Sequence, residues 1–237
     1  MSGHSKWANI KHRKGAQDAK RSKLFQKLAT EIMVAIKVGG NDPSTNTRLR
    51  LAIEKAKGQN MPNSNIGKLL KTKPKSGADF KELTYEGYGP FGTAILVQCL
   101  TDNLKRTSAT VTAAFTKNGG NLGTNGSVSY LFSRKGLIVI DEEIIEEDKL
   151  MEIALSLDIL DVKIEPGFYI IETEPGKFLK TKEELENAGI MNFISTEVSM
   201  VPKQTIELSE KEQSRVEKLV ELLEDNNDVQ AVYTNIT

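Results

Sequence analysis

Few residues of the sequence could serve as nucleophiles, metal ligands or disulfide partners. Its 237 residues include one cysteine and two histidines. Cys99 cannot form an internal disulfide and lies in an apolar stretch, so we expect it to be buried in a strand, in a protein of the reducing cytoplasm. His4 and His12 lie in a polar N-terminal segment, where no neighbouring structure would orient them as bases or metal ligands. We therefore expect no catalytic residues, no metal site and no cofactor, and predict that the protein is not an enzyme.

The sequence also lacks long apolar runs. The longest aliphatic run covers residues 94–97, whereas a membrane-spanning helix needs about 20 apolar residues. No apolar block follows the first basic residues, so a secretory signal is not expected. With 38% hydrophobic residues, the chain is predicted to be a soluble protein of one to three modest domains, monomeric in isolation and without a membrane partner.

The total net charge is zero, but the two signs are separated along the chain. Residues 1–77 hold 17 lysines and arginines and four acids, a net charge of +13. The remaining residues hold 15 lysines and arginines and 28 acids, a net charge of −13. A separation of this size predicts a polyanionic partner for the basic part, and nucleic acid is the leading candidate.

The densest group of cations lies near the N-terminus, together with the single tryptophan. Cations neutralise phosphates and release counterions, and an indole ring stacks on an unpaired base with about 1–3 kcal/mol. A tryptophan in a polar segment without apolar periodicity has no other structural reason, so nucleic-acid contact is favoured over a solvated tail. The contacts predicted in this segment are Lys6, Trp7, Lys11, His12, Arg13, Lys14, Lys20, Arg21, Lys23 and Lys27.

Residues 1–77 are predicted to form a basic tail followed by a small domain of three helices. From residue 16 the apolar residues recur at three- and four-residue steps until Gly39 and Gly40, which end the first helix. A second helix is expected before Gly58 and a shorter third one before Lys71. The polar residues 72–79, which contain proline and glycine, mark the boundary of this domain.

Residues 80–133 and 203–237 are predicted to form one middle α+β domain together. The first segment lacks part of an α/β sandwich, and the second supplies a strand, a helix and a further strand. Ser209 and Glu212 form a capping box at the start of that helix. The expected strands cover residues 83–88, 93–100, 127–132, 204–208 and 229–233, and the expected helices begin near residues 103 and 209.

A loop rich in glycine and asparagine, residues 118–126, has two interpretations. Its backbone N–H groups could bind a phosphate. It follows a helix instead of opening one, however, and so lacks the usual helix-dipole geometry. The favoured interpretation is a helix end and a tight turn into a strand.

Residues 134–202 show the order β-α-β-β-α-β, which is typical of a ferredoxin-like domain. Pro166 and Gly167 separate its two middle strands, and Thr181 with Glu184 predicts a capping box at its second helix. We interpret this unit as a ferredoxin-like domain inserted into the middle domain. The predicted fold class is therefore multidomain, with an α-helical N-terminal domain and two α+β domains.

A set of motifs is distributed along the whole chain and covers residues 1–14, 17–21, 48–53, 60–62, 85–90, 101–103, 119–123 and 228–233. These motifs closely resemble those of the YebC family, which includes bacterial proteins described as probable transcriptional regulators and the mitochondrial translational activator of cytochrome c oxidase. The N-terminal block is the most specific part of the resemblance. Phe91 and Leu104 depart from the family pattern.

The resemblance implies three domains, with the ferredoxin-like one inserted, and a role in gene expression without catalysis. It also extends the predicted nucleic-acid contacts to the first helices, adding Arg48, Arg50 and Lys55. The partner can be ribosomal RNA, for a ribosome-associated translation factor, or DNA, for a transcriptional regulator. RNA is favoured because a basic tail with an aromatic residue suits irregular RNA, and no base-reading helix-turn-helix is evident.

Overall fold

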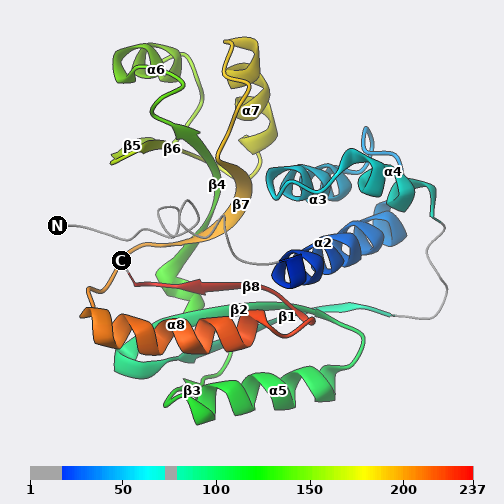
Figure 1. Ribbon diagram of the computed structural model, residues 1–237, viewed down its shortest axis with the longest axis vertical. Coiled ribbons are helices and arrows are strands. Elements are labelled where there is room, and N and C mark those ends of the chain that lie inside the picture. Colours follow the sequence, from blue (N-terminus) through cyan, green and yellow to red (C-terminus); the bar gives the residue numbers. More distant parts are fainter. Residues whose placement is uncertain (1–17, 73–78, 237) are drawn as a thin grey trace. The chain divides into compact units, whose positions relative to one another are not determined.

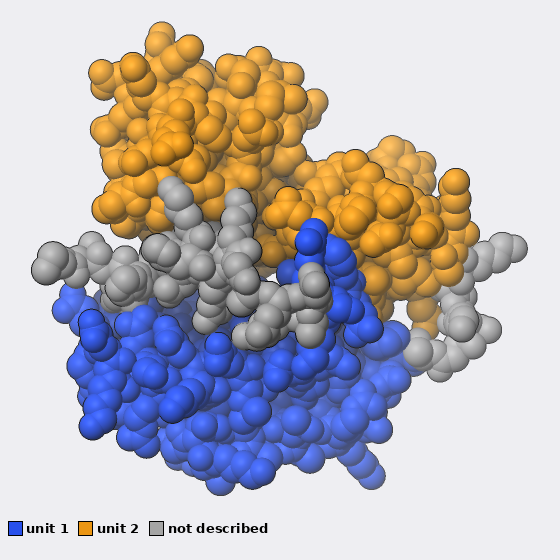
Figure 2. Space-filling model, in the orientation of Figure 1, with its two compact units in different colours: residues 1–27, 75–133, 201–237 blue, residues 28–74, 134–200 orange. Residues whose placement is uncertain are grey.

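The computed structural model describes residues 18–72 and 79–236, with side chains from Arg21 onward (Figure 1). The chain forms two compact units (Figure 2). Unit 1 consists of residues 1–27, 75–133 and 201–237, and unit 2 of residues 28–74 and 134–200. Each unit therefore combines segments that are far apart in the sequence.

Unit 1 is built on a four-stranded sheet with the order β3-β1-β2-β8. Its core includes Ile95, Val97 and Cys99 of β2, Phe115 of α5 and Leu219 of α8. Cys99 is buried as predicted, and burial raises the pKa of its thiol to about 12. The elements are β1 (Lys81–Tyr88), η2 (Pro90–Gly92), β2 (Ala94–Thr101), α5 (Leu104–Lys117), β3 (Asn121–Leu122), η3 (Ser129–Leu131), α8 (Glu210–Glu224) and β8 (Val229–Thr234).

Unit 2 contains a second sheet, with the order β5-β6-β4-β7, and the helices α3 and α4. The element order from β4 to β7 is the predicted β-α-β-β-α-β. α2 (Asp18–Gly39) contributes residues to both units. The other elements are α3 (Thr47–Gly58), α4 (Asn63–Lys71), β4 (Phe132–Asp141), α6 (Glu147–Ala154), β5 (Asp161–Glu165), β6 (Phe168–Thr173), α7 (Phe178–Asn187) and β7 (Ser195–Pro202).

The chain is thus a mixed α and β protein with two sheets. Strands from residues 81–122 and 229–234 share the first sheet, and strands from residues 132–202 form the second. The division into a helical domain, a middle domain and an inserted domain stays a prediction.

The expected strand over residues 127–132 is wrong. The chain forms η3 there, and β4 begins only at Phe132. The reason is the buried carboxylate of Glu86, which accepts hydrogen bonds from the N–H groups of Gly126, Val128 and Ser129 at 2.8–2.9 Å. A donor that is bound to a carboxylate is not available for a strand ladder.

Two other local predictions also differ from the structure. Thr181 does not cap α7, because that helix already begins at Phe178 and the Thr181 side chain is buried within it. Residues 204–208 form only an isolated bridge between Ile206 and Ile236. The capping box of Ser209 and Glu212 is confirmed.

Within unit 2, α3 contacts α7 and the core of the second sheet. Leu51 packs against that core. Lys182 of α7 forms ion pairs with Glu54 at 3.0 Å and Glu186 at 2.6 Å. Burial lowers the pKa of Lys182, but the hydrogen bonds to these two carboxylates outweigh it, so the pKa lies above its usual value.

None of the helices in residues 18–72 and 79–236 is long and apolar enough to cross a membrane. In the same ranges, no group of three or more His, Cys, Asp or Glu side chains is placed to hold a metal ion.

Replacing Glu86 with glutamine is expected to lower the free energy of unfolding by about 2 kcal/mol, because the charged acceptor of three N–H groups is lost. Burial raises the pKa of Glu86, but these hydrogen bonds outweigh it, so the pKa lies below its usual value. The stabilisation is therefore complete above the unfolded-state pKa and disappears as the pH falls through the folded-state value. Urea unfolding should show the difference between wild type and variant shrinking below about pH 4. Glu207→Gln, at an exposed position, serves as the control; an equal effect there contradicts the prediction.

Lys182→Met is expected to cost about 1–2 kcal/mol of stability, because it leaves the largely buried Glu54 carboxylate with one cation fewer. The matched control is Lys180→Met on the same helix, whose lysine pairs with Glu184 but is 74% exposed. That change should cost at most about 0.5 kcal/mol. Thermal unfolding of both variants measures the difference, and equal costs would argue against a structural role for the Lys182 pair.

Candidate nucleic-acid interface

The structure places only part of the predicted interface. Lys6, Trp7, Lys11, His12, Arg13 and Lys14 lie outside the described residues, and so does the side chain of Lys20. The six remaining predicted contacts belong to α2 and α3. Arg21, Lys23 and Lys27 lie in unit 1, and Arg48, Arg50 and Lys55 lie in unit 2.

Two of the α2 cations bind the C-terminal end of α8. The ammonium group of Lys23 lies 2.9 Å from the carboxylate of Asp225. Lys27 donates a hydrogen bond to the backbone carbonyl of Glu224. Both contacts are favourable because the carbonyl groups at a helix C-terminus carry partial negative charge. These cations therefore help to attach the start of α2 to the rest of unit 1.

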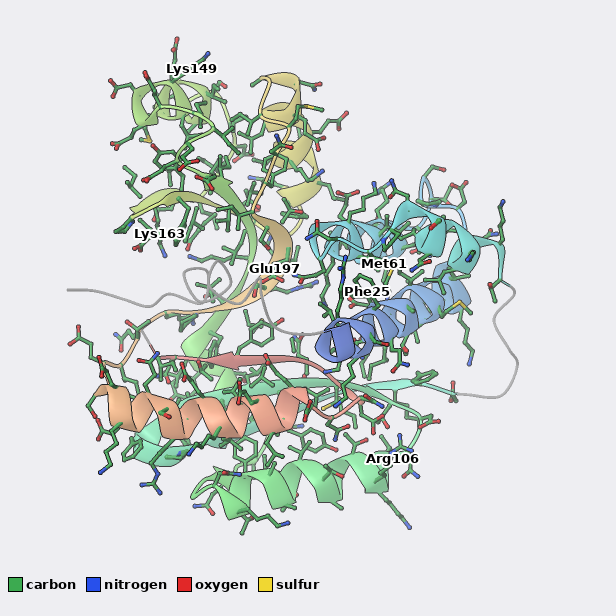
Figure 3. The ribbon with its side chains drawn as sticks, in the orientation of Figure 1. Phe25, Met61, Arg106, Lys149, Lys163 and Glu197 are labelled. Atoms are coloured by element: carbon green, nitrogen blue, oxygen red, sulfur yellow. The ribbon has the colours of Figure 1, made fainter. Side chains whose placement is uncertain are left out.

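Lys27 is half-buried, which distinguishes it from its neighbours on α2. Burial lowers its pKa, and the nearby Glu224 and Asp225 only partly oppose this effect. Arg21, in contrast, is exposed, and its guanidinium carbon lies 5.4 Å from the centre of the ring of Phe25, which Figure 3 labels on α2. Arg21 and Lys23 are thus exposed, whereas Lys27 is partly buried.

The α3 cations also have partners within their unit. Arg50 donates hydrogen bonds to the carbonyl oxygen of Ser44 at 2.9 Å and to the hydroxyl of Thr47 at 3.1 Å. Lys55 forms an ion pair with Glu31 of α2 at 2.9 Å, in a partly buried position. Arg48 is half-buried and likewise has an interaction within the chain. A contact with phosphate would compete with these internal interactions.

In the loop of residues 118–126, internal partners use the N–H groups that could have bound phosphate. Gly120 donates to the carbonyl of Phe115, Gly123 to the carbonyl of Glu86, and Gly126 to the Glu86 carboxylate. Gly119 and Gly126 have positive φ angles of 77° and 90°, which glycine adopts readily. This geometry agrees with a helix end followed by a turn.

Cations on α8 were missed by the sequence analysis because the surrounding segment is acidic overall. Lys211, Arg215 and Lys218 are exposed and lie on one side of the helix, since residues three and four apart are neighbours on a helix surface. The guanidinium carbon of Arg215 lies 5.6 Å from the centre of the exposed Phe91 ring. The spacing of four and three residues between Lys211, Arg215 and Lys218 is the sequence signal that could have identified these cations.

Two family models match this chain, one over its N-terminal part and one over the remainder. Residues 5–75 match the family model of the TACO1/YebC protein N-terminal domain, and residues 80–236 match that of the TACO1/YebC second and third domain. The chain is 50% identical over 239 residues to the probable transcriptional regulatory protein YrbC of Bacillus subtilis, covering 99% of each chain. It is 51% identical to a probable transcriptional regulatory protein of Geobacillus thermodenitrificans, covering 100% of this chain and 97% of the relative.

The fold is also similar to a solved structure. The crystal structure of a conserved hypothetical protein, Aq1575 from Aquifex aeolicus, superimposes with a TM-score of 0.84 at 42% sequence identity. The match covers 98% of this chain and 97% of the other. Both family models together span nearly the whole sequence, and the chain therefore belongs to the TACO1/YebC family.

Proposed function

We propose that this protein regulates gene expression by binding nucleic acid and that it does not catalyse a reaction. The observation that carries the proposal is the net charge of +13 in residues 1–77, which suits a polyanionic partner. The names of the relatives, probable transcriptional regulatory proteins, support a role in gene expression.

The proposed contacts are the basic and aromatic residues of the tail together with the predicted cations of α2 and α3, which are Lys20, Arg21, Lys23, Lys27, Arg48, Arg50 and Lys55. Trp7 stacks on a base or sugar, and the tail lysines and arginines bind phosphates. The ammonium groups of Lys23 and Lys27 already bind the Asp225 carboxylate and the Glu224 carbonyl. These two lysines therefore contribute to nucleic-acid binding through their positive potential and not through direct phosphate contacts. The acidic remainder of the chain orients the complex or contacts protein.

For the partner we favour RNA and a cytoplasmic, ribosome-associated role in translation, because the basic tail suits irregular RNA. DNA is the second candidate, and the regulatory names of the relatives favour it. The proposed architecture is a helical domain, a middle domain and an inserted ferredoxin-like domain. The presence of two separate sheets, with the orders β3-β1-β2-β8 and β5-β6-β4-β7, supports it.

Crosslinking in cells, followed by sequencing of the bound nucleic acid, tests the choice of partner. The RNA proposal expects ribosomal RNA crosslinked through residues 1–30 and co-sedimentation with ribosomes. Recovery of one DNA sequence, together with a more than tenfold preference for that duplex over random duplexes at fixed salt, would support the DNA candidate instead. Recovery of neither would overturn the proposed function.

Purified protein should bind nucleic acid with a strong salt dependence. Contact with about six phosphates predicts a slope of about −4 to −5 when log K is plotted against log salt concentration. Trp7→Ala should weaken binding to a single strand by about fivefold or more, because one stacked base is lost. Trp7→Phe keeps a ring and should retain most of the affinity. A flat salt dependence would contradict the electrostatic argument, and equal affinities for all three proteins would contradict the stacking role.

A further inference from the structure

A groove between α5 and α8 in unit 1 is the starting point for a second contact. The two helices lie side by side on one face of the first sheet (Figure 1). Between them is a cavity of about 150 Å³, lined by Thr110, Ala113 and Lys117 of α5, by Leu222 and Leu223 of α8, and by Asn226. Lys117 is the one cation among the lining residues. The cavity thus has an apolar floor and a lysine at its edge.

Further exposed cations lie along α8. Lys218 lies four residues before Leu222, and Arg215 and Lys211 follow on the same side of the helix. Lys211 and Lys218 form no ion pair with any residue that the structure describes. Two glutamates of α8 lie three residues from one of these cations, Glu212 from Arg215 and Glu221 from Lys218. The Glu212 carboxylate accepts hydrogen bonds from Ser209. These carboxylates reduce the positive potential in part, and the side chains of Lys211, Arg215 and Lys218 remain exposed beside the groove.

An exposed aromatic ring lies next to this line of cations. Phe91 is 44% exposed, and the guanidinium group of Arg215 lies over its ring. Its φ angle is 61°, in the left-handed region, which costs a residue with a Cβ atom about 1–2 kcal/mol. A strained, exposed residue of this kind indicates a role outside folding stability.

We propose that the α5–α8 groove binds an unpaired stretch of nucleic acid. A base stacks on Phe91, and the phosphates lie along Arg215, Lys211, Lys218 and Lys117. A basic groove combined with an aromatic platform is the usual arrangement for single strands. The inference rests on the proposed function and adds a second contact to it, in a part of the chain whose net charge is negative.

The test uses the full chain and a fluorescein-labelled oligouridylate of 20 nucleotides, with fluorescence anisotropy measured between 50 and 200 mM KCl. The variant Lys211→Gln, Arg215→Gln, Lys218→Gln should reduce the log–log salt slope by about 2, because each single-strand phosphate contact contributes about 0.7. The matched control removes three other exposed cations, Lys81→Gln, Lys105→Gln, Lys149→Gln, and should leave the slope unchanged.

Phe91→Gly tests the aromatic platform separately. It should weaken oligouridylate binding by about fivefold or more but leave the affinity for a 20-base-pair duplex unchanged. Glycine accepts the positive φ angle without strain, so the melting temperature should not fall, and a loss of affinity cannot be ascribed to misfolding. Phe91→Tyr keeps a ring and should bind as wild type does.

The outcomes separate the two proposals. If wild-type protein does not bind the oligonucleotide or the duplex at 50 mM KCl, the proposed function fails. If wild type binds but the α8 variant and its control behave alike, or if Phe91→Gly binds as wild type does, the groove inference is overturned while the proposed function stands. A groove that serves a protein partner would give this second result.

Discussion

The antiparallel pairing of β2 with β8 joins segments about 135 residues apart, and the architecture of unit 1 depends on it. It covers one edge of β2, which would otherwise be open to other strands. It also brings the preceding helix α8 onto the sheet, so that Leu219 and Leu223 complete a core with Ile95. At the end of the pairing, Asp228 accepts hydrogen bonds from Arg106 and Thr107 and ties the start of α5 to β8. Because closure entropy grows only slowly with loop length, the intervening residues 134–200 are compatible with this topology.

The separation of charge along the sequence has a structural counterpart. Lys23 of the basic N-terminal part pairs with Asp225 of the acidic part, and Glu54 of the basic part pairs with Lys182 of the acidic part. Exposed pairs are individually weak, and the Lys182–Glu54 pair is the less exposed of the two. The net charge of a segment therefore does not describe each of its faces. One side of α8 exposes Lys211, Arg215 and Lys218 although the segment around it is acidic.

Local features could be predicted from the sequence, and features that depend on distant residues could not. The second helix expected before Gly58 is α3, and its regularly spaced apolar residues Leu49, Ala52 and Ile53 are buried. The capping box of Ser209 was also readable because both of its residues lie within one turn. The turn at Val128 was not predictable, since it depends on the carboxylate of Glu86, more than 40 residues earlier in the chain. The cations of the candidate interface could be identified from the sequence. Their partners within the chain could not, because some lie about 200 residues away.

The backbone conformation of Phe91 matters for protein engineering. A screen that selects variants for thermal stability alone would favour glycine at this position, because glycine adopts the 61° φ angle freely. Such a screen would remove the ring beside Arg215 and register the change as an improvement. A stabilised form of this protein obtained in that way would be a well-folded reagent with an altered surface, so its interactions would not represent those of the natural chain.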